Sequence, residues 1–281
     1  MIRVLKFWPK GKVFDFLLNI SLFFYSHRRL PNRKWNFSDQ IFWQKCDVRY
    51  NLSPLVCLTS DKYLVKLFIS YVIGERFCVP TLDIVDTNEL NSTVFYDREV
   101  VVKPRHLSGF VTFYNAGDPV DQTRYRDICS RNHYEYFREM NYKYLPKGLI
   151  VEPILYGDRN LNDIKIFFYN GKLLFLQMDS DRGNDHRRLI FDKNFRSLEI
   201  SLKYPVNKHL RLPSNIATIC DLIQPLGSFF SRWVRIDCYT DGNDIKIGEI
   251  THCHGSSLER VIPAEGQSVF EDYVRAHLND S

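Results

Sequence analysis

The chain has 281 residues, 44% of them hydrophobic and 25% charged, and its net charge is +5. Such a composition is ordinary for a globular protein and allows one large domain or two lobes with a real core. The basic charge belongs to the N-terminus, because residues 1–35 carry a net charge of +7 and the remainder carries −2. A nucleic-acid-binding fold normally extends its basic residues across the surface, so this distribution argues against that class.

Seven cysteines are scattered along the sequence without CxxC spacing. This pattern indicates a reducing compartment and argues against a disulfide framework or a zinc ribbon. The triplet His252-Cys253-His254 has no second Cys or His cluster near it in the sequence, so we do not predict a structural zinc site.

Residues 1–58 are predicted to form an N-terminal extension with one or two helices. Its apolar run, Val13–Tyr25, is too short and too polar to cross a bilayer, and no signal-peptide cleavage site follows it. Two interpretations stay open: an amphipathic helix packed on the body, or a helix lying on an anionic membrane between flanking basic residues. For the second, the expected apolar face consists of Phe14, Leu17, Leu18, Phe24 and Tyr25.

The middle of the chain is predicted to hold two helices and three strands. These are a helix from the cap Ser60-Asp61 to Gly74, strands at 77–82, 99–104 and 110–113, and a helix at about 121–141. The loop 106–109 joins two of these strands and ends in the small residues Ser108 and Gly109. A strand, such a loop and a returning strand are typical of a flexible hairpin that covers phosphates.

The second half is predicted to be built around two hairpins. Its elements are a strand at 149–154, a hairpin of 162–169 and 172–178 around Asn170-Gly171, a helix at 214–230, a hairpin of 233–237 and 247–251 around Asp241-Gly242-Asn243-Asp244, and a helix at 267–278. The polar segment 179–184 is expected to be a loop. Antiparallel strands with helices on their faces indicate the α+β class.

The last hairpin carries an informative pair of acids. Asp237 and Glu249 are expected to lie opposite each other across the ladder, with both side chains on one face. Like charges so placed require a shared proton or a bound cation, and Arg235 lies on the same face. The pattern favours a divalent metal beside an arginine that meets a polyanion, as in a nucleoside-triphosphate site. The alternative is a surface hairpin with solvated acids.

Several motifs occur in the order used by ATP-grasp enzymes. They are Asp61-Lys62-Tyr63, Val101-Val102-Lys103-Pro104 with a following Ser-Gly loop, a strand ending in Glu152, Arg235-Ile236-Asp237 and Glu249-Ile250-Thr251. From about residue 35 to the C-terminus the chain resembles the TupA-like branch, through Phe37–Trp43, Asp61–Lys66, Asp163-Ile164-Lys165, Asn170-Gly171-Lys172, Asp181-Arg182 and Gly248–Thr251. The resemblance implies an ATP-grasp fold whose two lobes, 59–148 and 149–281, enclose the nucleotide between antiparallel sheets, with 1–58 as a helical extension.

The resemblance also implies roles for individual residues. For the nucleotide, it implies phosphate binding by Lys62 and Lys103 under a loop with Ser108 and Gly109, adenine binding by Glu152, and ribose binding by Asp163 with Lys165 beside it. For the reaction, it implies Mg²⁺ binding by Asp237, Glu249 and Thr251, and contact of Arg235 with the transferred phosphate, with Arg182 as a further positive group. The implied binding site of the substrate carboxylate is Gly255, Ser256 and Ser257. Thr251 replaces the Asn of many relatives, and the 106–109 loop is poor in glycine. Asp163 and Lys165 also fit the outward face of an exposed strand.

The implied activity is ATP- and Mg²⁺-dependent ligation of a carboxylate to an amine through an acyl-phosphate, with ADP and phosphate as products. For the TupA-like branch, the implied acceptor is a uronic-acid carboxyl on a glycan or lipid-linked saccharide, joined to an amino acid or amine in bacterial surface polysaccharide or capsule biosynthesis. The implied location is the cytoplasm, and in the membrane interpretation residues 1–35 contact the inner face of the plasma membrane.

Three other functions stay open from the sequence. Asp179-Ser180-Asp181 is a DxD pattern, which can hold a metal and a sugar nucleotide in a glycosyltransferase. ATP-grasp lobes also occur in sugar kinases. The glycine-poor loop 106–109, together with Thr251, is also compatible with a non-catalytic adaptor that has lost turnover. Stabilisation of the fold by ATP with magnesium, and not by a UDP- or GDP-sugar, would distinguish a ligase from a glycosyltransferase. An amide product, and not a phosphate ester, would distinguish a ligase from a sugar kinase.

Overall fold

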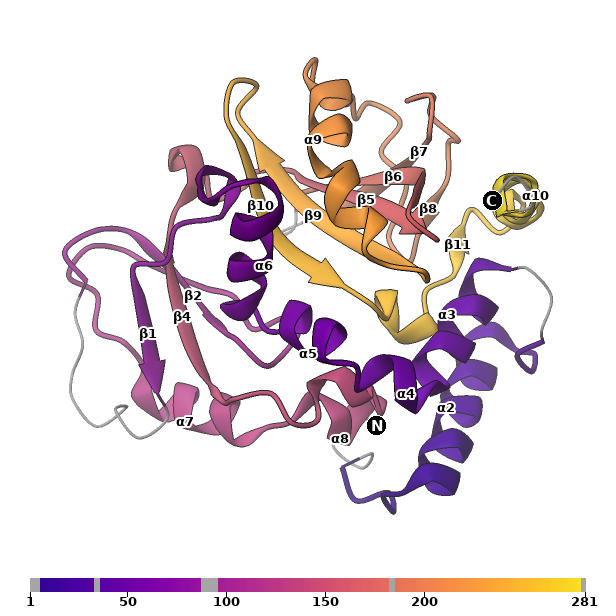
Figure 1. Cartoon of the computed structure of the whole chain (residues 1–281), viewed down its shortest axis with the longest axis horizontal. Helices are drawn as coiled ribbons and strands as arrows, with labels where there is room; N and C mark the ends of the chain where they lie inside the picture. Colours follow the sequence, from indigo (N-terminus) through magenta and orange to yellow (C-terminus); the bar gives the residue numbers. More distant parts are fainter. Residues whose placement is uncertain (1–5, 33–35, 87–95, 182–184, 279–281) are drawn as a thin grey trace.

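The computed structural model describes residues 6–32, 36–86, 96–181 and 185–278, which form a helical N-terminal part, a smaller sheet and a larger sheet (Figure 1). The N-terminal helices are α2 (Lys12–His27), α3 (Phe37–Cys46), α4 (Val48–Asn51) and α5 (Pro54–Ser60). The prediction of one or two helices was therefore too low. The side chain of Asp47 accepts hydrogen bonds from the backbone N–H groups of Arg49 and Tyr50, so it starts α4 directly after α3 ends.

Helix α3 joins the N-terminal part to the larger sheet. Phe37 is buried in one cluster with Phe175 and Trp233, and 4.8 Å separates the ring centroids of Phe37 and Trp233. Helix α2 packs in turn on α3, with 5.3 Å between the ring centroids of Phe23 and Phe42. The N-terminal helices are thus part of the folded body.

The smaller sheet is antiparallel and has the strand order β1-β4-β2-β3. Its strands are β1 (Asp83–Asp86), β2 (Val100–Pro104), β3 (Thr112–Tyr114) and β4 (Gly148–Pro153). Val100 and Val151 on one face are buried against helix α7 (Gln122–Ser130). Side chains alternate along a strand, so Lys103 and Glu152 lie on the opposite face.

The larger sheet is also antiparallel and has the order β10-β9-β5-β6-β7. Its strands are β5 (Asp163–Tyr169), β6 (Lys172–Ser180), β7 (Arg187–Asp192), β9 (Val234–Thr240) and β10 (Ile245–Thr251), and a separate pair consists of β8 (Ser201–Leu202) and β11 (Val261–Ile262). Helices α6 (Leu64–Ile73) and α9 (Ile216–Ser228) pack on one apolar face. On the other face, an aromatic half meets α3 and α10 (Gly266–Leu278), and the other half carries buried polar side chains, among them Asp163, Lys165 and Asp179.

The predicted boundary between the two lobes falls at residues 148 and 149, inside β4. Because β4 pairs with both β1 and β2, the chain passes from the smaller sheet to the larger one after Pro153. Helix α6, which precedes the smaller sheet in sequence, packs in the core of the larger one. The division into lobes stays a prediction, and the sheets favour a crossing after Pro153.

Both hairpins are confirmed, and several other elements differ from the prediction. The expected strand at 77–82 is wrong: a 3₁₀ turn, η1 (Glu75–Phe77), comes first, and β1 starts only at Asp83. The expected single helix at 121–141 is divided into α7, α8 (His133–Phe137) and η2 (Met140–Tyr142). Asn132 is extended and its side chain caps α8, which is why the helix cannot run through.

Candidate active site

Strands β9 and β10 place Glu249 directly opposite Asp237. A β-bulge between Ile247 and Glu249, at Gly248, shifts the register of the pair. A Cβ atom at Gly248 would lie 2.7 Å from the ring of Tyr239, so the bulge packs tightly on its partner strand. The two carboxylates therefore share one face of the hairpin, as the sequence predicted.

The guanidinium of Arg235 lies on this face between the predicted metal ligands. Its Nε donates to Oδ1 of Asp237 at 2.6 Å, and its Nη2 donates to Oδ2 at 2.8 Å. Nη2 also donates to the hydroxyl of Thr251 at 3.1 Å, and that hydroxyl donates to Oε1 of Glu249 at 2.9 Å. Although burial opposes it, Lys62 and Arg235 lower the pKa of Glu249 to about 2. Arg235, Asp237, Thr251 and Glu249 are thus joined in one hydrogen-bonded cluster of charged and polar side chains.

Lys165 on β5 is enclosed by three carboxylates. Its Nζ lies 2.7 Å from Oδ2 of Asp163, 3.2 Å from Oδ2 of Asp179 and 3.7 Å from Oδ2 of Asp237. Burial alone would lower the pKa of Lys165, but these acids raise it above its ordinary value. Asp163 and Lys165 are both buried, so the alternative of an exposed strand with outward polar residues is wrong. Ribose binding by Asp163 stays a prediction.

Asp179 and Ser180 belong to the end of β6, and both are buried. Asp179 lies opposite Arg188 on β7, with 2.8 Å between Oδ1 and Nε, and Arg188 also reaches Oε2 of Glu259 at 2.8 Å. The prediction of a loop at 179–184 is therefore wrong for Asp179 and Ser180, which belong to β6, and residues 182–184 lie outside the described residues. A DxD pattern with a buried, paired Asp179 is not an exposed sugar-nucleotide loop.

His254 connects Glu259 to Arg235. Its Nε2 lies 2.9 Å from Oε2 of Glu259, and its Nδ1 lies 2.7 Å from Nη1 of Arg235. A guanidinium only donates, so Nδ1 accepts and Nε2 carries the proton. Burial lowers the pKa of His254, which favours this neutral form. The contacts form a closed ring through Arg235, His254, Glu259, Arg188, Asp179, Lys165, Asp237 and back to Arg235.

On the facing sheet, Glu152 is buried between two lysines. Nζ of Lys66 lies 2.7 Å from its Oε1, and Nζ of Lys103 contacts its Oε2. Burial raises the pKa of Glu152, but Lys103 and Lys66 more than offset this and lower it below its ordinary value. The predicted phosphate lysine and the predicted adenine residue are thus in direct contact.

Lys62 links the smaller sheet to the hairpin of the larger one. Its ammonium donates to the backbone carbonyl of Leu107, directly after β2. Burial lowers the pKa of Lys62, and Glu249 partly opposes this. Lys103 acts on Glu249 as well, since it helps to lower the pKa of that carboxyl. Lys62 and Lys103 therefore lie close enough to Glu249 to act on its pKa, and these residues together with Arg235 mark the candidate active site.

The loop after β2 lies at the edge of this site. Ser108 and Gly109 are exposed, and Gly109 has a φ of 81° with open space where a Cβ would be. Phe110 packs under Arg131, with 5.1 Å from the guanidinium carbon to the ring centroid. The predicted cover over the phosphates stays a prediction.

The predicted substrate segment is η4 (His254–Ser257), which follows β10. Gly255, Ser256 and Ser257 have φ values of 52°, 55° and 66°. Left-handed serines are uncommon and strained, and such residues cluster at functional sites. The Ser256 hydroxyl bonds to Glu139, and both serines are buried. Their binding of a carboxylate stays a prediction.

The sequence did not indicate that Lys66, Arg188, His254, Glu259 and Glu139 belong to this network. Arg182, which was predicted as a further positive group, lies outside the described residues. For the strand residues there was a usable signal. Charged side chains two positions apart inside apolar strands, as in Asp163-Ile164-Lys165, mark a polar face that is itself covered. For Glu259 and Glu139 there was none, because loop positions carry no periodicity.

The predicted donors suit Mg²⁺ chemically. Asp237, Glu249 and Thr251 offer only oxygen atoms, and Mg²⁺ is usually bound by one or two carboxylates together with substrate phosphates and waters. Among the residues that the structure describes, no group of three or more His, Cys, Asp and Glu side chains is arranged to hold a metal by itself. Metal binding by these three residues stays a prediction.

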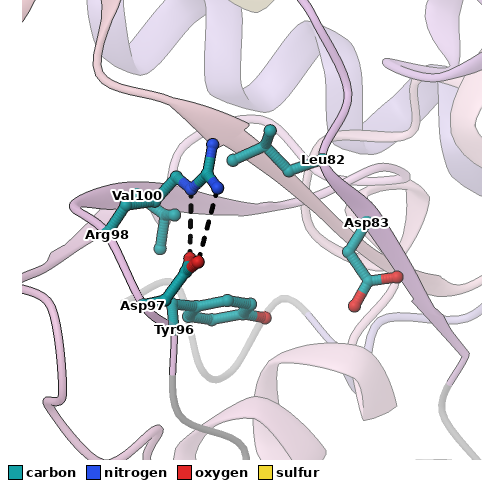
Figure 2. A pocket seen from close by; sticks show the side chains of 6 residues that line it. All are labelled: Leu82, Asp83, Tyr96, Asp97, Arg98 and Val100. Carbon is teal, nitrogen blue, oxygen red and sulfur yellow. Dashed lines mark hydrogen bonds and ion pairs between the residues drawn. The ribbon is translucent and has the colours of Figure 1, made fainter.

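A separate cavity of about 310 Å³ lies in the smaller sheet's half of the molecule (Figure 2). It is lined by Leu82, Asp83, Tyr96, Asp97, Arg98 and Val100. Val100 is on the α7 side of that sheet, opposite Lys103 and Glu152. The cavity shares no lining residue with the candidate active site.

Known structures with related architecture include three ligases or synthetases. D-alanine–D-alanine ligase from Bacillus anthracis is 14% identical, with a TM-score of 0.41 over 80% of this chain and 70% of that chain. The corresponding enzyme from Helicobacter pylori is 15% identical, with a TM-score of 0.42 over 84% and 68%. D-cycloserine synthetase DcsG is 16% identical, with a TM-score of 0.39 over 80% and 72%. No curated protein matches the sequence.

Residues 40–275, which are most of the chain, match the TupA-like ATPgrasp family. The antiparallel sheets with covering helices have the α+β architecture of the ATP-grasp fold. ATP-grasp ligases consume ATP with Mg²⁺ and release ADP. The chain belongs to the TupA-like ATPgrasp family and is an ATP-grasp ligase.

Proposed function

We propose that this chain joins a carboxylate to an amine, with its nucleotide held between the two sheets. The observation that carries the proposal is the approach of Lys62, from the turn between α5 and α6, and Lys103, from β2, to Arg235 and Glu249 of the larger sheet. A triphosphate needs positive groups that approach it from different walls, and this arrangement supplies them.

Each residue has a task in this proposal. Lys62 and Lys103 bind the phosphate chain, and Arg235 contacts the phosphoryl group in transfer, where negative charge develops. Asp237 and Glu249, with Thr251 beside them, would hold Mg²⁺, which neutralises phosphate charge when bound. The ring of contacts through Lys165 and His254 fixes these groups before the substrate arrives, so that little reorganisation is needed during reaction.

The chemistry needs no side-chain nucleophile. An oxygen of the substrate carboxylate attacks the γ-phosphorus and ADP leaves, giving an acyl-phosphate. The amine nitrogen then attacks the acyl carbon, phosphate leaves and one amine proton is lost. Closure of the site by the loop with Ser108 and Gly109 would exclude water, which would otherwise hydrolyse the acyl-phosphate. The strained segment Gly255–Ser257 is the proposed binding place of the carboxylate.

For the substrates, the proposal is a uronic-acid carboxyl on a glycan or lipid-linked saccharide and a small amine or amino acid. The context would be bacterial surface polysaccharide or capsule synthesis on the cytoplasmic side of the membrane. The support is family membership, together with a basic N-terminal region that suits an acceptor at an anionic surface.

Nucleotide binding is tested with Glu249→Gln and Lys103→Ala. We expect each to weaken binding of ATP with Mg²⁺ by about tenfold or more, measured by calorimetry. Lys103→Ala removes a positive charge that binds the phosphates, and Glu249→Gln removes a carboxylate ligand of Mg²⁺. Glu199→Gln, at an exposed ion pair with Lys208, is the matched control. Unchanged affinity in both site variants would remove these residues from the nucleotide site.

The reaction class is tested by isotope transfer. With an ¹⁸O-labelled uronate carboxylate, an acyl-phosphate route moves one labelled oxygen into inorganic phosphate as the amide forms. A sugar kinase would instead give a phosphate ester and leave the carboxylate oxygens in place. Mass spectrometry of both products distinguishes the two outcomes.

A further inference from the structure

Helix α2 presents an apolar face to solvent. Five of its side chains are between 46% and 67% exposed, and we call them the outer face: Val13, Phe14, Leu17, Phe24 and Tyr25. They fall on one side of the helix because they recur at helical spacing. Exposure continues beyond the helix at Phe7, Trp8 and Leu30. Of the seventeen large hydrophobic side chains exposed among the described residues, eight lie between residues 7 and 30.

The opposite side of α2 is fixed to the protein. Leu18, Leu22 and Phe23 are buried, and Oδ1 of Asp15 lies 2.9 Å from Nε of the buried Arg138. The prediction that Leu18 belongs to the exposed apolar face is therefore wrong, whereas Phe14, Leu17, Phe24 and Tyr25 are exposed as expected. Figure 1 shows α2 at the periphery beside α3, away from both sheets. The outer face is thus a rigidly mounted surface.

Basic side chains flank the outer face. Lys6 precedes α2, Lys12 begins it and Arg28 caps its end. Within the part of the chain that the structure describes, none of these three forms an ion pair. Lys10 and Arg29, by contrast, are neutralised by Glu135 and Asp39. An apolar strip with positive charge at both ends complements a surface that is apolar inside and anionic outside.

The C-terminal end of α2 also contacts the proposed substrate segment. The hydroxyl of Ser26 donates to the backbone carbonyl of Leu258, and Nε2 of His27 bonds to the carbonyl of Ser257 at 2.8 Å. Burial lowers the pKa of His27. The helix with the apolar outer face therefore holds η4 in place from its other side.

We propose that the outer face of α2 docks on an anionic lipid bilayer, with the helix parallel to the membrane surface. Its apolar side chains would enter the boundary between headgroups and acyl chains, and Lys6, Lys12 and Arg28 would meet the lipid phosphates. None of the described helices is long and apolar enough to cross a bilayer. A second copy is disfavoured as the occupant, because self-association of this face brings like charges together from both ends.

One consequence rests on the proposed function. Docking through α2 brings η4 and its carboxylate subsite close to the lipid surface. The acceptor that this geometry suits is a saccharide carried on a membrane lipid, whose uronate reaches the site while its anchor stays in the bilayer. The docking surface itself does not depend on that function.

The test is vesicle co-sedimentation of the full chain. The vesicles contain phosphatidylglycerol and phosphatidylcholine in equal parts, or phosphatidylcholine alone. We expect binding to the anionic vesicles that weakens as salt rises, and a loss of about tenfold or more in the triple variant Phe14→Ser, Leu17→Ser, Phe24→Ser. The matched control is Leu67→Ser with Tyr71→Ser, which removes exposed apolar side chains from α6 and should bind like the unmodified chain. Lys12→Glu with Arg28→Glu should also lose binding.

Circular dichroism and calorimetric ATP binding show that each variant is folded, and these readouts are independent of lipid. Equal vesicle binding by the triple variant, or no binding by the unmodified chain, would overturn the proposal. A dimer that the triple variant converts to a monomer in light scattering would also overturn it and assign the face to a second copy. Failure of ATP binding in the unmodified chain would instead count against the proposed function and leave the vesicle result standing.

Discussion

Arg235 is the residue at which the contacts of the active site converge. Asp237 receives two of its hydrogen bonds, and Nδ1 of His254 receives a third. The imidazole must be neutral, since imidazolium carries N–H groups on both nitrogens and would repel the guanidinium. Glu259 holds that tautomer through Nε2. His254 thus acts through Arg235 as a positioning residue.

We expect His254→Ala to lower kcat by roughly 10- to 100-fold, because a misdirected guanidinium stabilises the transferring phosphoryl group less well. The Kd for ATP should change by less than about twofold, since Lys62 and Lys103 remain. Steady-state kinetics and calorimetry measure the two quantities, with exposed His209→Ala as control. A drop in ATP affinity at unchanged kcat would show that His254 serves ground-state binding instead.

Among the elements, α9 shows how closely a helix lies on the larger sheet. Gly227 on α9 faces Phe168 on β5, and a Cβ atom there would lie 2.3 Å from the ring. Phe168 is fully buried between strands and helices, so its ring cannot move into solvent. Only a glycine allows the helix and the strand to approach this far.

Gly227→Ala should therefore destabilise the protein. Helix propensity favours Ala over Gly by about 1 kcal/mol, but overpacking of a tight core costs about 1–3 kcal/mol. We expect a net loss of about 1 kcal/mol in the free energy of unfolding, measured in urea. Phe168→Leu in the same chain makes room and should reduce that loss. A variant as stable as the unmodified chain would mean that Phe168 adjusts without strain.

At the scale of the whole molecule, His252 ties the N-terminal helices to the active-site hairpin. Its Nε2 lies 2.8 Å from the hydroxyl of Thr59 on α5, and its Nδ1 lies 3.2 Å from the hydroxyl of Tyr50 on α4. Burial lowers its pKa to about 3. The folded protein therefore holds this imidazole in its neutral form well below neutral pH.

Stability should consequently fall in acid. Because the folded-state pKa of His252 is below the unfolded value of about 6.5, its contribution is complete above that pH and is lost as pH falls toward 3. Each such histidine adds a slope of about 1.4 kcal/mol per pH unit within this window. In His252→Gln, the slope of the free energy of unfolding against pH between 6.5 and 4 should be smaller by about 1.4 kcal/mol per pH unit. Exposed His209→Gln should behave like the unmodified chain, and equal slopes in both variants would contradict the assignment.

The sequence alone determined those features that depend on near neighbours. Asn170-Gly171 and the turn after Thr240 place both hairpins. The turn alone would set Gly248 opposite Asp237, and the β-bulge at Gly248 brings Glu249 to that position. The ordered motifs around Lys62, Lys103, Glu152 and Arg235 pointed to an ATP-grasp site. Local turn chemistry and strand alternation suffice for such statements, because they act over a few residues.

Only the tertiary structure decided how these residues are partnered. Lys66 reaches Glu152 across 86 positions, and Arg188 reaches Glu259 across 71, so no local pattern could pair them. The same holds for α2: periodicity showed a helix with an apolar stripe, but it could not tell buried Leu18 from exposed Leu17. Which side of a helix or strand is covered depends on the elements packed on it, and distant segments of the chain supply those elements.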